Sequence, residues 1–281
     1  MDLHAVLREI ATRARDDALV FPTSAELALQ ARRLLDDPDC PADKLARLVQ
    51  ADPMLATRVV AVANSAAYSR GGKPITDVRG AIARVGFATL RSLATSVVVR
   101  QMQGMAATPE HRQLAAQLWE HTAHVAALAQ VIARRVTRVD GETALFAGVV
   151  HEVGGFYLIA RAADFPGLLE MHPGDLIDWA DGGAAEVGRT VLRRLEVPAM
   201  VMEAIEGLWR GYLAMPPQSL ADTLLLADQL APVESPLSTL AGFGHGDAAV
   251  SIDFALDERT LAEVLDESAG DVKSLIGALR A

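Results

Sequence analysis

Apolar residues recur every three to four positions along most of the chain, which is the spacing of one face of an α-helix. The segment after Pro109 shows this most clearly, and the following residues share its apolar face: Leu114, Leu118, His121, Val125, Leu128 and Ile132. No stretch alternates apolar and polar residues for long enough to build a sheet. The pattern therefore predicts an all-α protein with many helices.

Several helix starts are marked by a capping side chain. Asp52-Pro53 and Thr108-Pro109 each join an N-cap residue to a proline in the first turn, where the missing N–H does no harm. Thr76 is the expected cap of the next helix. Gly86 is expected to break that helix, and another is predicted from about residue 87 to residue 102.

The chain divides where helix signals give way to turn residues. Gly104 to Thr108 is the predicted boundary between two helical halves, and Pro232 to Asp247, rich in Pro, Gly and Ser, reads as a linker or loop. Two final helices are expected near Glu258–Asp266 and Gly270–Leu279. The predicted units are a first helical half, a second helical half, and a linker with C-terminal helices: residues 1–105, 106–232 and 233–281.

Composition narrows the class of protein. The 281 residues suffice for one large domain or two small ones, and a hydrophobic content of 51% excludes wholesale disorder. With 26 basic and 36 acidic residues, the net charge of −10 disfavours nucleic acid and anionic membranes as partners. Cys40 is the single cysteine, so no intrachain disulfide can form. We expect a soluble, cytoplasmic protein without a signal peptide or membrane span.

Four residues from three separate segments are candidates for chemistry. His121 lies on the apolar face of its helix, and His151-Glu152 follows the apolar run from Leu145 to Val150. Asp228 shares a helix face with Leu224 and Leu225. Buried imidazoles and carboxylates need partners, which a metal ion or mutual hydrogen bonds would supply. The spacing allows either a metal site or a hydrogen-bonded core network.

The chain resembles a known family, the HDOD domain, an output-type relative of the HD metal-dependent phosphohydrolases. The resemblance extends from about Leu19 to Pro232. It rests on four motifs: Asp52-Pro53-Met54-Leu55, Ala63-Asn64-Ser65-Ala66-Ala67-Tyr68, Leu118-Trp119-Glu120-His121-Thr122, and Ala147-Gly148-Val149-Val150-His151-Glu152-Val153-Gly154. It implies a multi-helix HDOD fold, with an N-terminal helical subdomain up to residue 105 and a C-terminal HD-like subdomain.

The departures from the family pattern concern the same site. Glu152 stands where HD proteins have aspartate, and Ala184 and Leu208-Trp209 stand where the family often has histidines. Catalytic metal sites need a nearly complete set of ligands and an open position for water. We therefore expect a degenerate remnant site at His121, His151, Glu152 and Asp228, in a pocket that Leu208 and Trp209 dry and fill.

Three functions follow from this reading. The first is a non-enzymatic module of bacterial signal transduction that acts through contacts with signalling proteins in trans or with a second copy of the chain. The second is a metal-dependent phosphohydrolase or phosphodiesterase using the four remnant residues. The third is a regulator that binds a nucleotide without chemistry. The first hypothesis predicts no enzyme activity and no cofactor. A divalent metal at the remnant residues is the one cofactor that it would accommodate.

Overall fold

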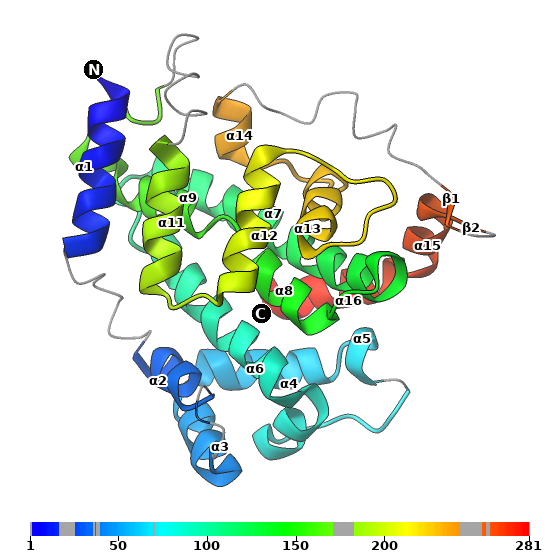
Figure 1. Ribbon diagram of the computed structural model, residues 1–281. Helices are drawn as coiled ribbons and strands as arrows, with labels where there is room; N and C mark the ends of the chain where they lie inside the picture. Colours follow the sequence, from blue (N-terminus) through cyan, green and yellow to red (C-terminus); the bar gives the residue numbers. More distant parts are fainter. Residues whose placement is uncertain are drawn as a thin grey trace.

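The computed structural model shows a protein built of α-helices, with one short pair of strands (Figure 1). It describes the following residues: 2–16, 26–35, 37, 40–69, 71–170, 183–241, 255–256 and 259–280. The helices of the first part are α1 (Leu3–Asp16), α2 (Glu26–Leu35), α3 (Ala42–Ala51), α4 (Pro53–Ala63), α5 (Ala66–Ser69) and α6 (Val78–Gln103). The all-α prediction is confirmed.

The second part contains the longest uninterrupted α-helix and the elements around it. They are α7 (Pro109–Ile132), the π-helical turn η2 (Ala133–Thr137), α8 (Gly141–Val150), α9 (Val153–Arg161), the 3₁₀ turn η3 (Ala162–Asp164), α11 (Ala184–Arg194), α12 (Ala199–Arg210) and α13 (Leu220–Gln229). The C-terminal elements are α14 (Pro236–Leu240), β1 (Ala255–Leu256), β2 (Arg259–Thr260), α15 (Leu261–Glu267) and α16 (Ala269–Arg280).

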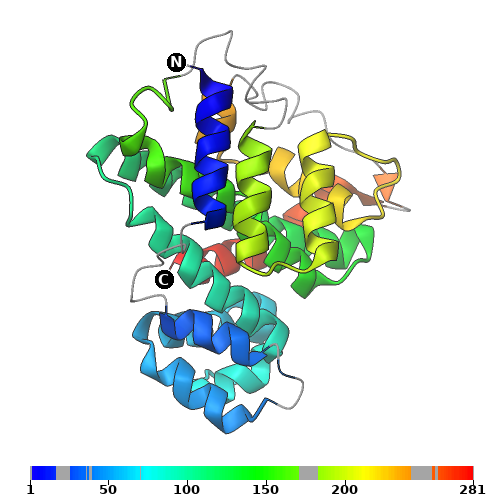
Figure 2. The same ribbon diagram turned by 60° about the vertical axis from the view of Figure 1, so that its left-hand side comes forward.

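The helices form a smaller lobe and a larger one. Figure 2 shows α2, α3, α4 and α5 together at the bottom, below the body that contains α7, α8 and α9. α6 contacts both lobes, because it packs on α2, α3 and α4 and also on α8 and α9. The predicted division at residue 105 stays a prediction. Spatially, however, α1 lies with the larger lobe against α11, and α16 packs on α4, α5 and α7.

The capping side chains explain where the helices of the smaller lobe begin. Asp52 Oδ1 accepts hydrogen bonds from the backbone N of Met54 and Leu55 at 3.0 and 3.1 Å, as its predicted capping role requires. The predicted cap at Thr76 is wrong. Asp77 caps α6 instead, with Oδ1 2.8 Å from Gly80 N, since a carboxylate one residue later reaches the third N–H of the helix.

Gly86 interrupts α6 as expected. Its φ of +82° lies in the left-handed region, where glycine alone carries no steric penalty. The chain turns there and resumes as a helix in which residues 92 to 99 are buried. The β-branched run from Thr95 to Val99 is therefore helical, as its neighbours predicted. Packing against the surrounding helices overrides its preference for strands.

The predicted linker after Pro232 is partly wrong. Residues 236–240 form the short helix α14, opened by Pro236, and Leu237 is buried against the core. The remaining linker residues 242–247 lie outside the described part. The two C-terminal helices are confirmed as α15 and α16. β1 and β2 pair antiparallel over two residues each, and this pairing gave no signal in the sequence.

Two helical stretches have the length and apolar character of a membrane span. They are Val78–Gln103 and Gly141–Asp164, and 67% and 83% of their most apolar windows are buried inside the fold. The core helices of a soluble protein can be as long and as apolar as helices that span a membrane. Their hydrophobicity is accounted for by the core that they build.

α7 and α8 approach each other closely at Gly148. A Cβ atom added to Gly148 would lie 2.5 Å from Ala126 Cα and 2.9 Å from Ala126 N. Neither is a side-chain atom that could rotate away. Gly148 therefore lets the end of α8 approach the backbone of α7 more closely than any other residue would.

We predict that Gly148→Ala lowers the free energy of unfolding by about 1–3 kcal/mol, because the added methyl group forces the two helices apart. Urea denaturation measures the change. The matched control is Gly277→Ala, at an exposed position inside α16 with no atom within 4 Å of the added Cβ. This control should be neutral or stabilising by up to about 1 kcal/mol. Equal effects of the two substitutions would contradict the close approach.

Candidate functional site

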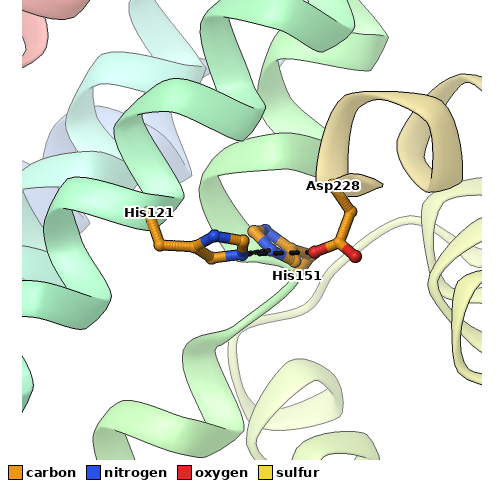
Figure 3. A group of neighbouring side chains, drawn as sticks. All are labelled: His121, His151 and Asp228. Atoms are coloured by element: carbon orange, nitrogen blue, oxygen red, sulfur yellow. Dashed lines mark hydrogen bonds and ion pairs between the residues drawn. The ribbon is translucent and has the colours of Figure 1, made fainter. Parts of the chain in front are cut away.

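Three of the four predicted site residues meet in the larger lobe. Figure 3 shows the side chains of His121, His151 and Asp228 pointing toward one another from α7, the end of α8 and the end of α13. His121 Nε2 lies 3.2 Å from Asp228 Oδ1 and 3.3 Å from His151 Nε2. One ligand atom from each residue falls within 4.8 Å of the other two.

Local structure holds each histidine in place. His121 is fully buried (0% exposed) on the core face of α7, as its place in the apolar series predicted. His151 is the C-cap residue of α8 and is 4% exposed. The close approach of α8 to α7 at Gly148 brings the two rings together, with their centroids 5.4 Å apart.

The hydrogen bonds of the two histidines fix their tautomers. His121 Nδ1 lies 2.8 Å from the carbonyl O of Val233, and His151 Nδ1 lies 2.7 Å from that of Gly148. A carbonyl oxygen can only accept, so each Nδ1 carries the proton. In the neutral rings both Nε2 atoms then present lone pairs toward the same point. Two lone pairs 3.3 Å apart require a proton or a cation between them.

The same geometry separates the proton affinities of the two rings. Burial opposes the charged form of His121, but the hydrogen bond to Asp228, the charges of Glu152 and Asp228 and the Val233 carbonyl outweigh it and raise its pKa. Burial, followed by the charge of His121, lowers the pKa of His151 to about 4. Without a metal, His121 is therefore the ring of the two that takes up a proton first, and its Nε2–H would then be donated to Asp228.

The three residues also fit a divalent metal ion. Ligands bound to one ion at about 2.1 Å are separated by about 3.0 to 3.4 Å in octahedral or tetrahedral geometry. The two separations from His121 Nε2, 3.2 and 3.3 Å, match this, and the three ligand atoms together lie within 4.8 Å of one another. Each Nδ1–H donated to a carbonyl is the outer contact typical of a metal-bound histidine. Two imidazoles and one carboxylate suit zinc, iron or manganese.

Glu152, the fourth predicted residue, lies outside this group of ligand atoms but lines the same cavity. Burial raises the pKa of its carboxyl group, and the charge of His121 opposes that rise. Glu152 is half-buried, and it contributes a carboxyl group to the cavity rather than a fourth ligand to the three.

The cavity next to the three ligands has a volume of about 400 Å³. Leu208 and Trp209 line its wall together with Ala184, so the expectation that they fill the pocket is wrong. Trp209 instead packs over Gly188, where an added Cβ would lie 3.0 Å from the indole ring. The cavity therefore stays open.

Among the described residues that line this cavity, there are carboxylate side chains but no lysine or arginine. Of the described residues that line it, Glu152 and Asp228 are acidic, and none is lysine or arginine. The remaining lining residues are small, apolar or neutral and polar. A cavity of this composition attracts cations and repels anions.

Sequence reasoning missed the groups that orient the histidines. The carbonyl of Val233 fixes His121, yet Val233 lies in the segment taken for a linker. Main-chain carbonyls leave no trace in residue type, so no sequence signal could have found it. His124, which follows His121 by three residues on α7, bonds the Glu120 carbonyl in its own helix, in agreement with its predicted place off the inner face.

We predict that His151→Ala and Asp228→Ala each lower the free energy of unfolding by about 1–3 kcal/mol, since each leaves a buried polar partner without its hydrogen bond. Thermal unfolding of metal-free protein measures the effect. His124→Ala is the matched control and should change stability by less than about 0.5 kcal/mol. Unchanged melting of both site variants would show that the three side chains do not form a buried network.

Solved structures with this fold come from several bacteria. One from Shewanella amazonensis SB2B, provisionally named a metal-dependent phosphohydrolase, is 24% identical, with a TM-score of 0.70 and coverage of 99% of both chains. An HDOD domain protein of unknown function from Geobacter sulfurreducens is 19% identical, with a TM-score of 0.60 and coverage of 98% of this chain and 96% of that one.

A protein from Marinobacter aquaeolei VT8, provisionally named a signal transduction protein, is 20% identical with a TM-score of 0.60. The match covers 100% of this chain and 67% of that one. At these identities the likeness shows the fold alone. No curated protein gave a significant match. The HDOD domain family matches residues 21–207, two thirds of the sequence, and the chain therefore belongs to the HDOD family.

Proposed function

We propose that this protein is a non-enzymatic module of bacterial signal transduction that acts through protein contacts. The observation that carries the proposal is the charge of the cavity beside His121, His151 and Asp228. A phosphate ester entering it would meet the carboxyl groups of Glu152 and Asp228, and no lysine or arginine among the described lining residues. Phosphoryl transfer depends on cationic groups that neutralise developing negative charge.

The absence of further metal ligands also supports a non-enzymatic function. Ala184, Leu208 and Trp209 offer no donor atom for a second metal ion where relatives often carry histidines. His121, His151 and Asp228 are enough to hold one ion. The carboxyl group of Glu152 does not belong to this group of ligands. The same composition weakens a nucleotide-binding role for this cavity, since triphosphate or diphosphate groups need the same positive charge.

An exposed apolar surface supports a protein partner. Tyr212 and Met215, in the loop after α12, are 79% and 62% exposed, and Met200 on α12 is 59% exposed. Large aromatic residues and methionines are enriched at protein interfaces relative to other surfaces. Tyr212 and Met215 line one hollow, and Tyr212 directly follows Gly211, which lines the cavity beside the remnant site. A bound partner would therefore lie close to the remnant site.

We predict no metal-dependent hydrolysis of phosphomonoesters, cyclic dinucleotides or nucleoside triphosphates in the presence of Mg²⁺, Mn²⁺, Fe²⁺ or Zn²⁺. Release of phosphate and of hydrolysed nucleotide measures the rate. The reference is Asp228→Ala, and the expected rates of the two proteins are equal. A wild-type rate that exceeds this reference about 100-fold or more would contradict the proposal, since that is the loss expected when one metal ligand of a working site is removed.

The second candidate is a metal-dependent phosphohydrolase, which the geometry of His121, His151 and Asp228 favours. The ion would be held by the two Nε2 atoms and Asp228, and would supply a polarised water molecule as nucleophile. Glu152, whose pKa is raised by burial, would lie near enough to act on a proton in the same cavity. The substrate phosphate would then depend on the metal for all of its charge neutralisation.

Metal content tests the second candidate. A working metal centre requires that protein purified without chelator or affinity tag carry iron, manganese or zinc at close to one ion per chain, because three preoriented ligands bind such ions. Asp228→Ala would then lose the ion, and His124→Ala would keep it. For the proposed signalling module we expect wild-type protein with no more metal than Asp228→Ala, which leaves a proton-linked network as the role of the three residues. Elemental analysis measures this.

A further inference from the structure

A second cavity, of about 340 Å³, lies where the smaller lobe meets the start of α7. Its lining includes three arginines from three helices, Arg58, Arg100 and Arg112, and shares no residue with the cavity beside His121. None of its described lining residues is acidic. Three positive charges gathered around one hollow are unusual in a chain with a net charge of −10.

Arg58 on α4 is fully buried, with 0% of its surface exposed. One nitrogen, Nη1, donates to Ser96 Oγ at 3.0 Å, while Nε and Nη2 are buried without a hydrogen-bond partner. Nε–H and Nη2–H lie on one edge of the guanidinium plane and donate in parallel, which matches two oxygens of one phosphate or carboxylate. A buried arginine with that edge unpaired is costly unless an anion completes it.

The other two arginines keep their charges available. Arg100 donates to the carbonyl of Arg280, and Arg112 donates to the carbonyls of Ala106 and Ala107. Carbonyl groups orient these guanidinium groups without cancelling their charge. Arg112 is exposed at the rim of the cavity, whereas Arg58 and Val97 form its buried floor.

One acidic group acts on Arg58: the charge of Asp52 favours the charged form of Arg58, while Asp52 Oδ1 accepts the capping hydrogen bonds of α4. This single carboxylate offsets at most one of the three positive charges. Glu120 pairs with Arg280 and not with the arginines of the cavity. Burial and then the charge of Arg100 lower the pKa of Arg58 to about 10, so Arg58 remains charged at neutral pH.

An aromatic side chain completes the site. The Trp119 ring lies beneath two of the guanidinium groups, with the Cζ atoms of Arg58 and Arg100 5.8 and 6.0 Å from its centroid. Cation–π contact holds both groups through the faces of their guanidinium planes and does not use their N–H donors. Met54 lies on the rim and is 45% exposed, which gives an organic portion of a ligand an apolar surface.

We propose that this cavity binds the phosphate group of a small anionic ligand, with Arg58 as the buried bidentate donor and Arg100 and Arg112 as flanking charges. Three cations favour a dianionic phosphate over a singly charged carboxylate. The site joins α4, α6 and the start of α7, so a ligand bound there contacts both lobes. The inference does not depend on the proposed function, because the two cavities are lined by different residues.

Calorimetric titration and thermal unfolding of the full chain with inorganic phosphate test this site, at ionic strength matched with sodium chloride. We expect saturable binding at or below about 10 mM phosphate and a rise in melting temperature, since the anion binds only the folded state. Acetate at the same concentration serves as the carboxylate probe and should give a smaller rise.

Variants locate the binding. Arg112→Ala, at the exposed rim, should retain the fold and weaken phosphate binding about tenfold, the loss expected for one charge-assisted contact. Arg58→Met should abolish binding, and Arg8→Ala, an exposed arginine on α1, should leave it unchanged. If Arg58→Met does not fold, Arg112→Ala alone decides. No saturable binding, equal affinity of Arg112→Ala and wild type, or an equal response to acetate would overturn the assignment.

Discussion

The approach of α8 to α7 at Gly148 is the constraint on which the candidate site depends. The absence of a side chain there lets α8 lie against the backbone of Ala126, and the next residues of the chain, ending in His151, are carried to the face of α7 that presents His121. The carbonyl of Gly148 also accepts the proton of His151 Nδ1 and so sets its tautomer. One glycine therefore decides both where the second imidazole lies and which of its nitrogens is available.

The resulting site favours positively charged ligands. Two imidazoles with converging lone pairs and two carboxyl groups favour a cation, whether a proton shared between His121 and Asp228 or a metal ion. The arginine cavity at the junction of the lobes has the opposite preference, since its described lining holds three guanidinium groups and no acid. Both sites draw on α7, whose first turns contribute Arg112 and whose middle contributes His121. The two cavities share no lining residue, so the two proposals assign ligands of opposite charge to separate places in the fold.

The two lobes are joined by more than the covalent chain. α6 packs on helices of both lobes, and α16 packs on α4 and α5 of the smaller lobe and on α7 of the larger one. These contacts bury apolar faces that each lobe would otherwise expose, so the lobes stabilise each other. A ligand that changed the packing of α4 on α6 and α7 would therefore affect the larger lobe as well.

The sequence by itself determined the elements and the candidate residues. Apolar spacing, the Asp52 and Thr108 caps and Gly86 fixed most helix positions, because these signals act within a few residues. The site residues were found because His121 lies in an apolar series and His151-Glu152 matches a family motif. Tertiary structure alone decided that Glu152 stays out of the ligand group, that Trp209 covers Gly188 and leaves a cavity, and that Val233 orients His121. It also brought Arg58, Arg100 and Arg112 together. These outcomes depend on distances between segments far apart in the chain and on main-chain carbonyls, and neither is encoded in the identity or spacing of nearby residues.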